Sequence, residues 1–113
     1  MFRLFFILVF VFISNTFAEV IDEEDKNIVD CLILQDEDSI VCKYMHERMQ
    51  TDKNIIVKWI DPQGELSRQR TLIIPAGHGS IYDFRYIQGR EKGLWQFIVI
   101  DGKDEYSTTF EIQ

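Results

Sequence analysis

The sequence predicts an all-β protein, an antiparallel two-sheet sandwich of about seven short strands preceded by a signal peptide. Two observations lead to this prediction. Apolar and polar residues alternate with period two in short runs, and turn-forming residues separate these runs. No segment shows a sustained helical period of apolar residues. A small closed barrel is the alternative architecture for the same strand pattern.

Residues 1–18 have the parts of a secretory signal peptide. Met1–Arg3 is a short basic start, and Leu4–Ile13 is an unbroken apolar run. Small residues at Thr16 and Ala18 fit cleavage after Ala18. A membrane anchor is the alternative, but the apolar run is about half of the roughly 20 residues that a span requires. We therefore expect a periplasmic or secreted protein with no membrane span after cleavage.

Residues 19–26 form an acidic segment, which we expect to be a flexible arm before one domain of residues 27–113. The full chain has a net charge of −7, and loss of Arg3 with the signal peptide makes it −8. This charge argues against nucleic acid and anionic membranes as partners, since both require a positive surface.

Charge is unevenly distributed along the chain. Residues 19–38 hold nine carboxylates and one Lys, whereas residues 68–92 hold five basic and two acidic residues. One interpretation is a dipole that steers a basic partner or binds cations. The other is a solvated acidic arm with ordinary surface charge elsewhere.

Two strand-like stretches, NIVDCLIL and SIVCKYMH, flank a turn centred on Asp36 and Glu37. This centring sets Cys31 opposite Cys42, at a separation that a disulfide can bridge. Two cysteines in an exported chain usually pair, so we predict a structural disulfide. The spacing excludes a CxxC redox pair, and a metal site would need ligands in addition to the nearby His46.

Three further strands are predicted in the middle of the chain, at residues 55–60, 66–74 and 80–87. Asp61–Gly64, with the sequence DPQG, fits a type I turn and would set Trp59 against Leu66. Pro75–Gly79 is a clear break before the third of these strands.

Residues 93–112, with the sequence GLWQFIVIDGKDEYSTTFEI, form the clearest β-hairpin in the chain. With Gly102 and Lys103 as the turn, Trp95 faces Phe110 on one side of the hairpin. A slip of one residue would expose both rings, so the pattern specifies this register.

A sandwich of this length needs most of its aromatic residues for its own core. We predict a core that contains Trp59, Tyr82, Phe84, Tyr86, Trp95, Phe97 and Phe110. Apolar residues on the opposite strand faces would form an outer patch if they gather on one sheet. These residues are Leu32, Val41, Ile56, Ile60 and Ile98.

The segments VKWIDPQG, YDFRY and GLWQFIVIDG with TTFEI resemble immunoglobulin-like β-sandwich domains of small exported proteins of Gram-negative bacteria. The resemblance covers nearly all of the mature chain at the level of pattern. It implies an immunoglobulin-like sandwich and a role in binding proteins or ligands. One feature departs from antibody-type domains, in which a disulfide joins distant strands. Here Cys31 and Cys42 would staple neighbouring strands.

No arrangement typical of catalysis is evident. The serines lack a GxSxG context, and the two cysteines are expected to be oxidised. His78, between glycines in a loop, is the one candidate metal ligand, and an ordinary exposed histidine is the alternative. The acidic clusters lack the spacing of a calcium loop.

We therefore expect a non-catalytic exported binding or structural module of the bacterial envelope, acting through a sheet face or a loop tip. Its partner would be a protein or another envelope component, and no cofactor is expected. One alternative is a protein that binds a metal or small ligand at His78 or the acidic clusters. A hydrolase with an unrecognised site is the other.

Overall fold

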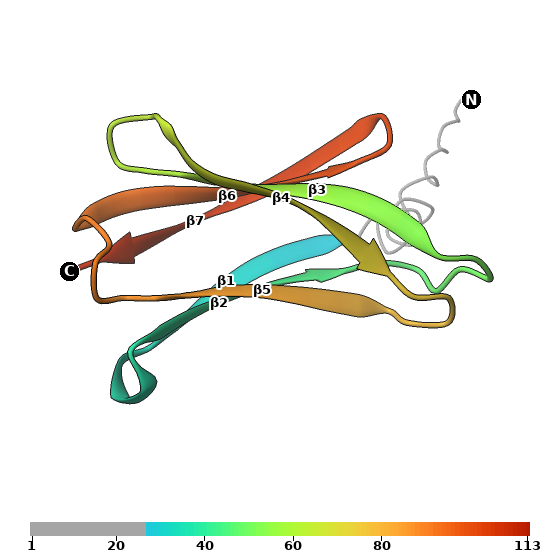
Figure 1. Cartoon of the computed structure of the whole chain (residues 1–113), viewed down its shortest axis with the longest axis horizontal. Coiled ribbons are helices and arrows are strands. Elements are labelled where there is room, and N and C mark those ends of the chain that lie inside the picture. The colour runs from blue at the N-terminus through green and yellow to red at the C-terminus, as the bar shows by residue number, and fades with distance from the viewer. Residues whose placement is uncertain (1–26) are drawn as a thin grey trace, which may run out of the picture.

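The computed structural model describes residues 27–113, which form seven β-strands and one short 3-10 turn (Figure 1). The predicted signal peptide and acidic arm lie outside the described residues. The 3-10 turn η3 (Gln35–Glu37) joins the first two strands. The strands are β1 (Ile28–Leu34), β2 (Ser39–Met45), β3 (Lys53–Ile60), β4 (Leu66–Ile74), β5 (Ser80–Tyr86), β6 (Gly93–Asp101) and β7 (Asp104–Ile112).

The strands form two sheets that lie one above the other (Figure 1). One sheet has three strands in the order β1-β2-β5, and the other has four in the order β4-β3-β6-β7. All neighbouring strands are antiparallel. The prediction of an all-β, antiparallel two-sheet sandwich is confirmed, and its arrangement is compatible with an immunoglobulin-like fold.

Both predicted hairpins have the predicted register. Cys31 lies opposite Cys42 with their Cα atoms 4.0 Å apart, and the predicted disulfide is present. It staples two neighbouring strands of the three-stranded sheet. In the C-terminal hairpin Trp95 lies opposite Phe110, and the turn residue Gly102 has a φ of 64°.

The turn between β3 and β4 changes the pairing that follows it. The predicted pairing of Trp59 with Leu66 is wrong, because the register shifts at the end of β3 and Trp59 lies opposite Arg68. Gly64 in the turn has a φ of 84°, in the left-handed region that strains residues with a side chain. Directly opposed residues share one face of a sheet, so Arg68 points inward beside Trp59.

The core lies between the two sheets and contains aromatic pairs at its centre. Trp59 packs edge-on against Phe97 with ring centroids 5.1 Å apart, and Trp95 stacks on Phe110 at 6.1 Å. All four side chains are buried. The other buried apolar residues are Ile40, Cys42, Tyr44, Ile55, Val57, Leu72, Ile74, Val99 and Ile112.

The prediction that Tyr82, Phe84 and Tyr86 belong to the core is wrong. Their exposed fractions are 57%, 46% and 59%. Side chains alternate along a strand, and Asp83 lies opposite the core residue Cys42. Asp83 therefore takes the inward position and the three aromatic side chains point outward.

Reduction of the Cys31–Cys42 disulfide is expected to lower the free energy of unfolding by about 3 kcal/mol, because the unfolded chain gains the freedom of the opened loop. Urea denaturation with and without dithiothreitol measures the difference. The double variant C31A/C42A is the control, and dithiothreitol should leave its unfolding unchanged. An equal response of both proteins to the reductant would contradict the prediction.

Candidate functional site

The outer face of the three-stranded sheet carries a group of exposed and half-buried apolar side chains. Leu32, Val41 and Phe84 form one row across its three strands, and Tyr82 and Tyr86 flank Phe84 along β5. We call these five residues the aromatic face. Leu32 is 61% exposed, and Phe84 packs edge-on against Tyr86 with ring centroids 5.5 Å apart. Single exposed apolar residues are ordinary, whereas a contiguous group is the kind of surface that a partner can cover.

A hollow of about 320 Å³ opens on the aromatic face. Leu32, Val41 and Tyr82 supply its apolar walls. The ammonium group of Lys43 lies 5.8 Å from the centre of the Tyr82 ring, within the range of a cation–π contact. Lys43 and Asp30 add charged groups to the lining of the hollow.

Asp83 is the buried polar residue behind the aromatic face. Its side chain is 2% exposed. The indole Nε1–H of Trp59 donates to Oδ2 at 2.8 Å, and Nη1 of Arg70 donates to Oδ1 at 2.7 Å. Nη1 of Arg68 lies 3.7 Å from the same Oδ1. Both carboxylate oxygens are therefore satisfied, which allows Asp83 to remain buried.

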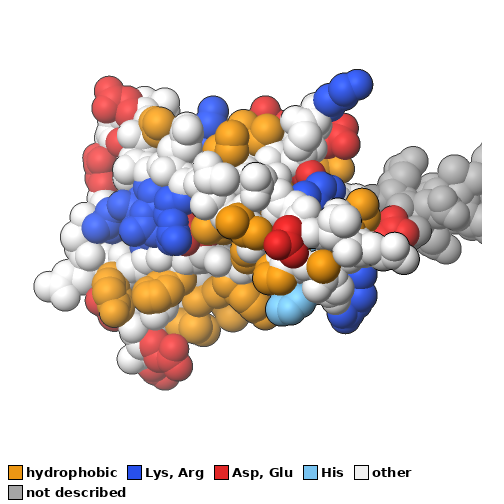
Figure 2. Space-filling view, turned by 45° about the vertical axis from the view of Figure 1, so that its right-hand side comes forward, with side chains coloured by type: hydrophobic (Ala, Val, Ile, Leu, Met, Phe, Trp, Pro, Cys, Tyr) orange, Lys and Arg blue, Asp and Glu red, His pale blue; other side chains and the backbone are white. Residues whose placement is uncertain are grey.

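A basic pocket of about 460 Å³ lies at the open edge between β4 and β5, and we call it the arginine pocket. Arg68 and Arg70 reach it from β4, Arg85 from β5, and Arg90 from the loop after β5. Asp83 is the one carboxylate among the described residues that line it. Figure 2 shows basic side chains gathered between the two layers, with hydrophobic side chains beside them on the three-stranded sheet.

Arg85 extends inward over the aromatic core. Its guanidinium carbon lies 5.4 Å from the centre of the Trp59 ring and 5.9 Å from that of Trp95. Burial, followed by the positive charges of Arg90 and Arg68, lowers the pKa of Arg85 to about 10. The pocket therefore holds more positive charge than its carboxylate neutralises.

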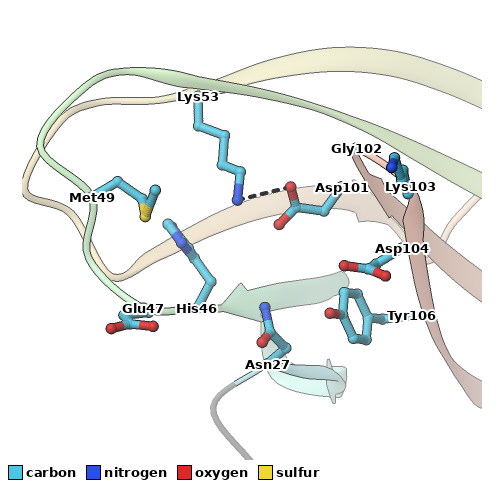
Figure 3. Close-up of a pocket in the computed structure, with 10 residues that line it drawn as sticks. All are labelled: Asn27, His46, Glu47, Met49, Lys53, Asp101, Gly102, Lys103, Asp104 and Tyr106. Carbon is cyan, nitrogen blue, oxygen red and sulfur yellow. Dashed lines mark ion pairs between the residues drawn. The ribbon is translucent and has the colours of Figure 1, made fainter.

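A second pocket, the His46 pocket, has a volume of about 450 Å³ and includes the turn between β6 and β7 (Figure 3). His46 is 7% exposed and stacks on Tyr44 with ring centroids 5.6 Å apart. Neither imidazole nitrogen has a hydrogen-bond partner within residues 27–113. Lys53 and Asp101 form an ion pair of 2.9 Å on its wall. Both imidazole nitrogens are themselves buried, so the pocket does not present them to a ligand.

Tyr44 joins the two sheets next to the His46 pocket. Its hydroxyl donates to Oδ2 of Asp101 at 2.6 Å and accepts from Nδ2 of Asn27 at 2.8 Å. Burial, followed by the hydrogen bond to Asp101, raises the pKa of Tyr44 well above its ordinary value of about 10. The neutral phenol is therefore the form that the fold favours.

The structure places His78, the candidate metal ligand, on the exposed loop between β4 and β5. Its backbone N–H donates to the carbonyl of Pro75 at 3.1 Å. Within residues 27–113, no three His, Cys, Asp or Glu side chains gather in a way that could hold a metal ion. The fold therefore does not bring His78 together with further described ligands.

The apolar residues predicted on the outer strand faces divide between the two sheets. Leu32 and Val41 belong to the aromatic face. On the four-stranded sheet Ile98 lies opposite Lys58, so polar side chains interrupt that surface. The other two predicted residues on this sheet, Ile56 and Ile60, are half-buried.

The arginine pocket was not predicted from the sequence. Its signal is the basic bias of residues 68–92, together with arginines at alternate positions 68 and 70 of one strand. Alternate positions share a face, but the sequence does not show which face is inward.

Comparison with known protein families found no match, and no curated protein is significantly similar to the chain. In the described part of the chain, no helix combines the length and apolar character needed to cross a membrane. The function must therefore be argued from the geometry of the surfaces and pockets.

Replacing Asp83 by Ala is expected to lower the free energy of unfolding by about 2 kcal/mol, because the buried indole N–H of Trp59 loses its acceptor. Asp83→Asn retains an acceptor oxygen and should cost less. Urea denaturation of both variants measures the losses. Equal losses from the two substitutions would show that the hydrogen bond to Trp59 does not account for the effect.

Tyr44 should make the stability fall at alkaline pH. Its pKa is higher in the folded chain, so its contribution is complete below about pH 10 and is lost as the pH rises through the folded-state pKa. This loss should approach about 1.4 kcal/mol per pH unit. The variant Y44F should show a shallower decline when unfolding is measured between about pH 8 and about pH 11. Identical slopes would contradict the assignment.

Proposed function

We propose that the protein is a non-catalytic exported binding module of the bacterial cell envelope, which binds a protein partner through the aromatic face. One observation carries the proposal: Tyr82, Phe84 and Tyr86 of one edge strand are all exposed on the same sheet face, and Tyr82 lines the hollow there. Tyrosine and arginine are enriched among the residues that contribute most to protein binding. Both types meet where the aromatic face adjoins the arginine pocket.

These aromatic side chains take no part in the core between the sheets. The core between the sheets is filled by other side chains, including Trp59 and Trp95. Polar residues could occupy positions 82, 84 and 86 of the strand without exposing apolar surface to water. A partner that covers the face supplies the missing reason for their presence.

The immunoglobulin-like identity and the periplasmic location belong to this proposal. The Cys31–Cys42 disulfide fits an exported protein, because such bonds persist in oxidising compartments. The predicted signal peptide of residues 1–18 would deliver the chain there. The two-sheet arrangement supports an immunoglobulin-like module that presents one sheet face to its partner.

Site-specific photo-cross-linking in the producing cells tests the proposal. A photoreactive phenylalanine analogue at Tyr86 is expected to form a discrete covalent adduct with one protein, because this position would lie inside the interface. Leu94 is the matched control, since it is 60% exposed compared with 59% for Tyr86 and lies in the other sheet.

The same adduct should be lost when Phe84→Ser removes a neighbouring ring of the aromatic face. That substitution is at an exposed position, so it should change the free energy of unfolding by no more than about 0.5 kcal/mol. Absence of an adduct at Tyr86, or equal adducts at Tyr86 and Leu94, would reject the aromatic face as the binding surface.

A further inference from the structure

The backbone of β5 has one open edge. Within residues 27–113, β5 pairs with β2 and with no second strand. The Gly79 carbonyl accepts from the N–H of His46, and the Ile87 N–H donates to the Asp38 carbonyl. Odd-numbered residues along β5 therefore direct their backbone groups toward β2, since these directions alternate in antiparallel pairs.

The even-numbered residues Ser80, Tyr82, Phe84 and Tyr86 consequently direct their N–H and C=O groups to the open edge. One contact supports this direction, because the Phe84 carbonyl accepts from Nη1 of Arg68, 3.3 Å away in the other sheet. An extended peptide that pairs with β5 would satisfy these groups.

A strand added to β5 would have two chemically different sides. Side chains opposite Tyr82, Phe84 and Tyr86 would continue the aromatic face outward. Side chains opposite Asp83 and Arg85 would point inward to the arginine pocket. The first set would bury apolar surface, and the second would meet guanidinium groups.

The positive charge of the arginine pocket determines which inward side chains an added strand should carry. Four guanidinium groups line the arginine pocket with one carboxylate, and both oxygens of that carboxylate already have partners. A neutral strand would desolvate these charges without compensation, whereas Asp or Glu side chains would form charge-assisted hydrogen bonds with them.

We propose that the β5 edge binds an extended acidic peptide segment of the protein partner, in which Asp or Glu residues alternate with apolar residues. The acidic side chains enter the arginine pocket and the apolar ones cover the aromatic face. This inference rests on the proposed binding function and specifies the partner that it recognises. A peptide is favoured over an anionic polysaccharide because only a peptide backbone can complete the hydrogen-bonding edge of β5.

Selection from a library of random peptides slightly longer than β5, displayed against the oxidised protein, tests this inference. The enriched peptides should alternate acidic and apolar residues. The variant R68Q/R90Q should bind them about tenfold more weakly or worse, as measured by isothermal titration calorimetry. This variant retains the hydrogen bond from Arg70 to Asp83 and the contact of Arg85 with the ring of Trp59.

The matched control is K58Q/K103Q, which removes the same charge away from the arginine pocket and should retain the affinity within about twofold. Enriched peptides without acidic residues, or equal losses in the two double variants, would overturn the inference. Binding of dextran sulfate with no acidic peptide selected would overturn it in favour of a polysaccharide. If no peptide is selected and the protein forms a concentration-dependent dimer, the β5 edge would instead bind a second copy of the chain.

Backbone methylation of the best peptide tests the pairing itself. N-methyl groups on the alternate residues whose N–H groups face β5 should abolish binding. N-methyl groups on the other alternate residues should leave binding unchanged, because their N–H groups point away from β5. Equal effects of the two methylated peptides would reject pairing of the peptide with the β5 edge.

The cross-link at Tyr86 separates this inference from the proposed function. An adduct that forms equally in the wild type and in R68Q/R90Q would retain the binding function and reject the acidic segment. Absence of the adduct in the wild type would reject the binding function itself.

Discussion

The hydrogen bond from the indole of Trp59 to the carboxylate of Asp83 connects the two sheets across the core. An unpartnered indole N–H or carboxylate at this depth would be unfavourable, so the two groups hold each other inside the sandwich. Because side chains alternate along β5, the inward position of Asp83 sends Tyr82 and Phe84 outward. A single buried contact thus produces both the core arrangement and the exposed face.

The same contact explains the position of the arginines. Arg70 donates a hydrogen bond to the second carboxylate oxygen of Asp83. The shifted register at the end of β3 brings Arg68 close to the same oxygen. Arg85 follows Asp83 by two residues along β5 and therefore also points inward, over the ring of Trp59. The open edge of the sandwich is lined with positive charge in a chain whose net charge is negative.

At the other edge of the three-stranded sheet, different interactions hold the strands. The Cys31–Cys42 disulfide ties β1 to β2, and Tyr44 reaches Asp101 of the opposite sheet. These contacts fix β2 as the centre of its sheet, with β5 as one outer strand. Within the described residues, this sheet presents both an aromatic face and an open backbone edge on β5, which together suit the proposed recognition of an extended segment.

The sequence by itself determined the all-β sandwich, the registers of both hairpins and the disulfide, because each depends on alternation and turn spacing within a short segment. It did not determine the orientation of YDFRY in β5 or the existence of the arginine pocket. Either face of that strand could be inward on pattern alone, and the aromatic one was the wrong choice. The deciding partners of Asp83 are Trp59 and Arg70, which lie 24 and 13 residues away in the chain. Only the packing of one sheet on the other brings them together, so the tertiary structure decided which side chains form the candidate site.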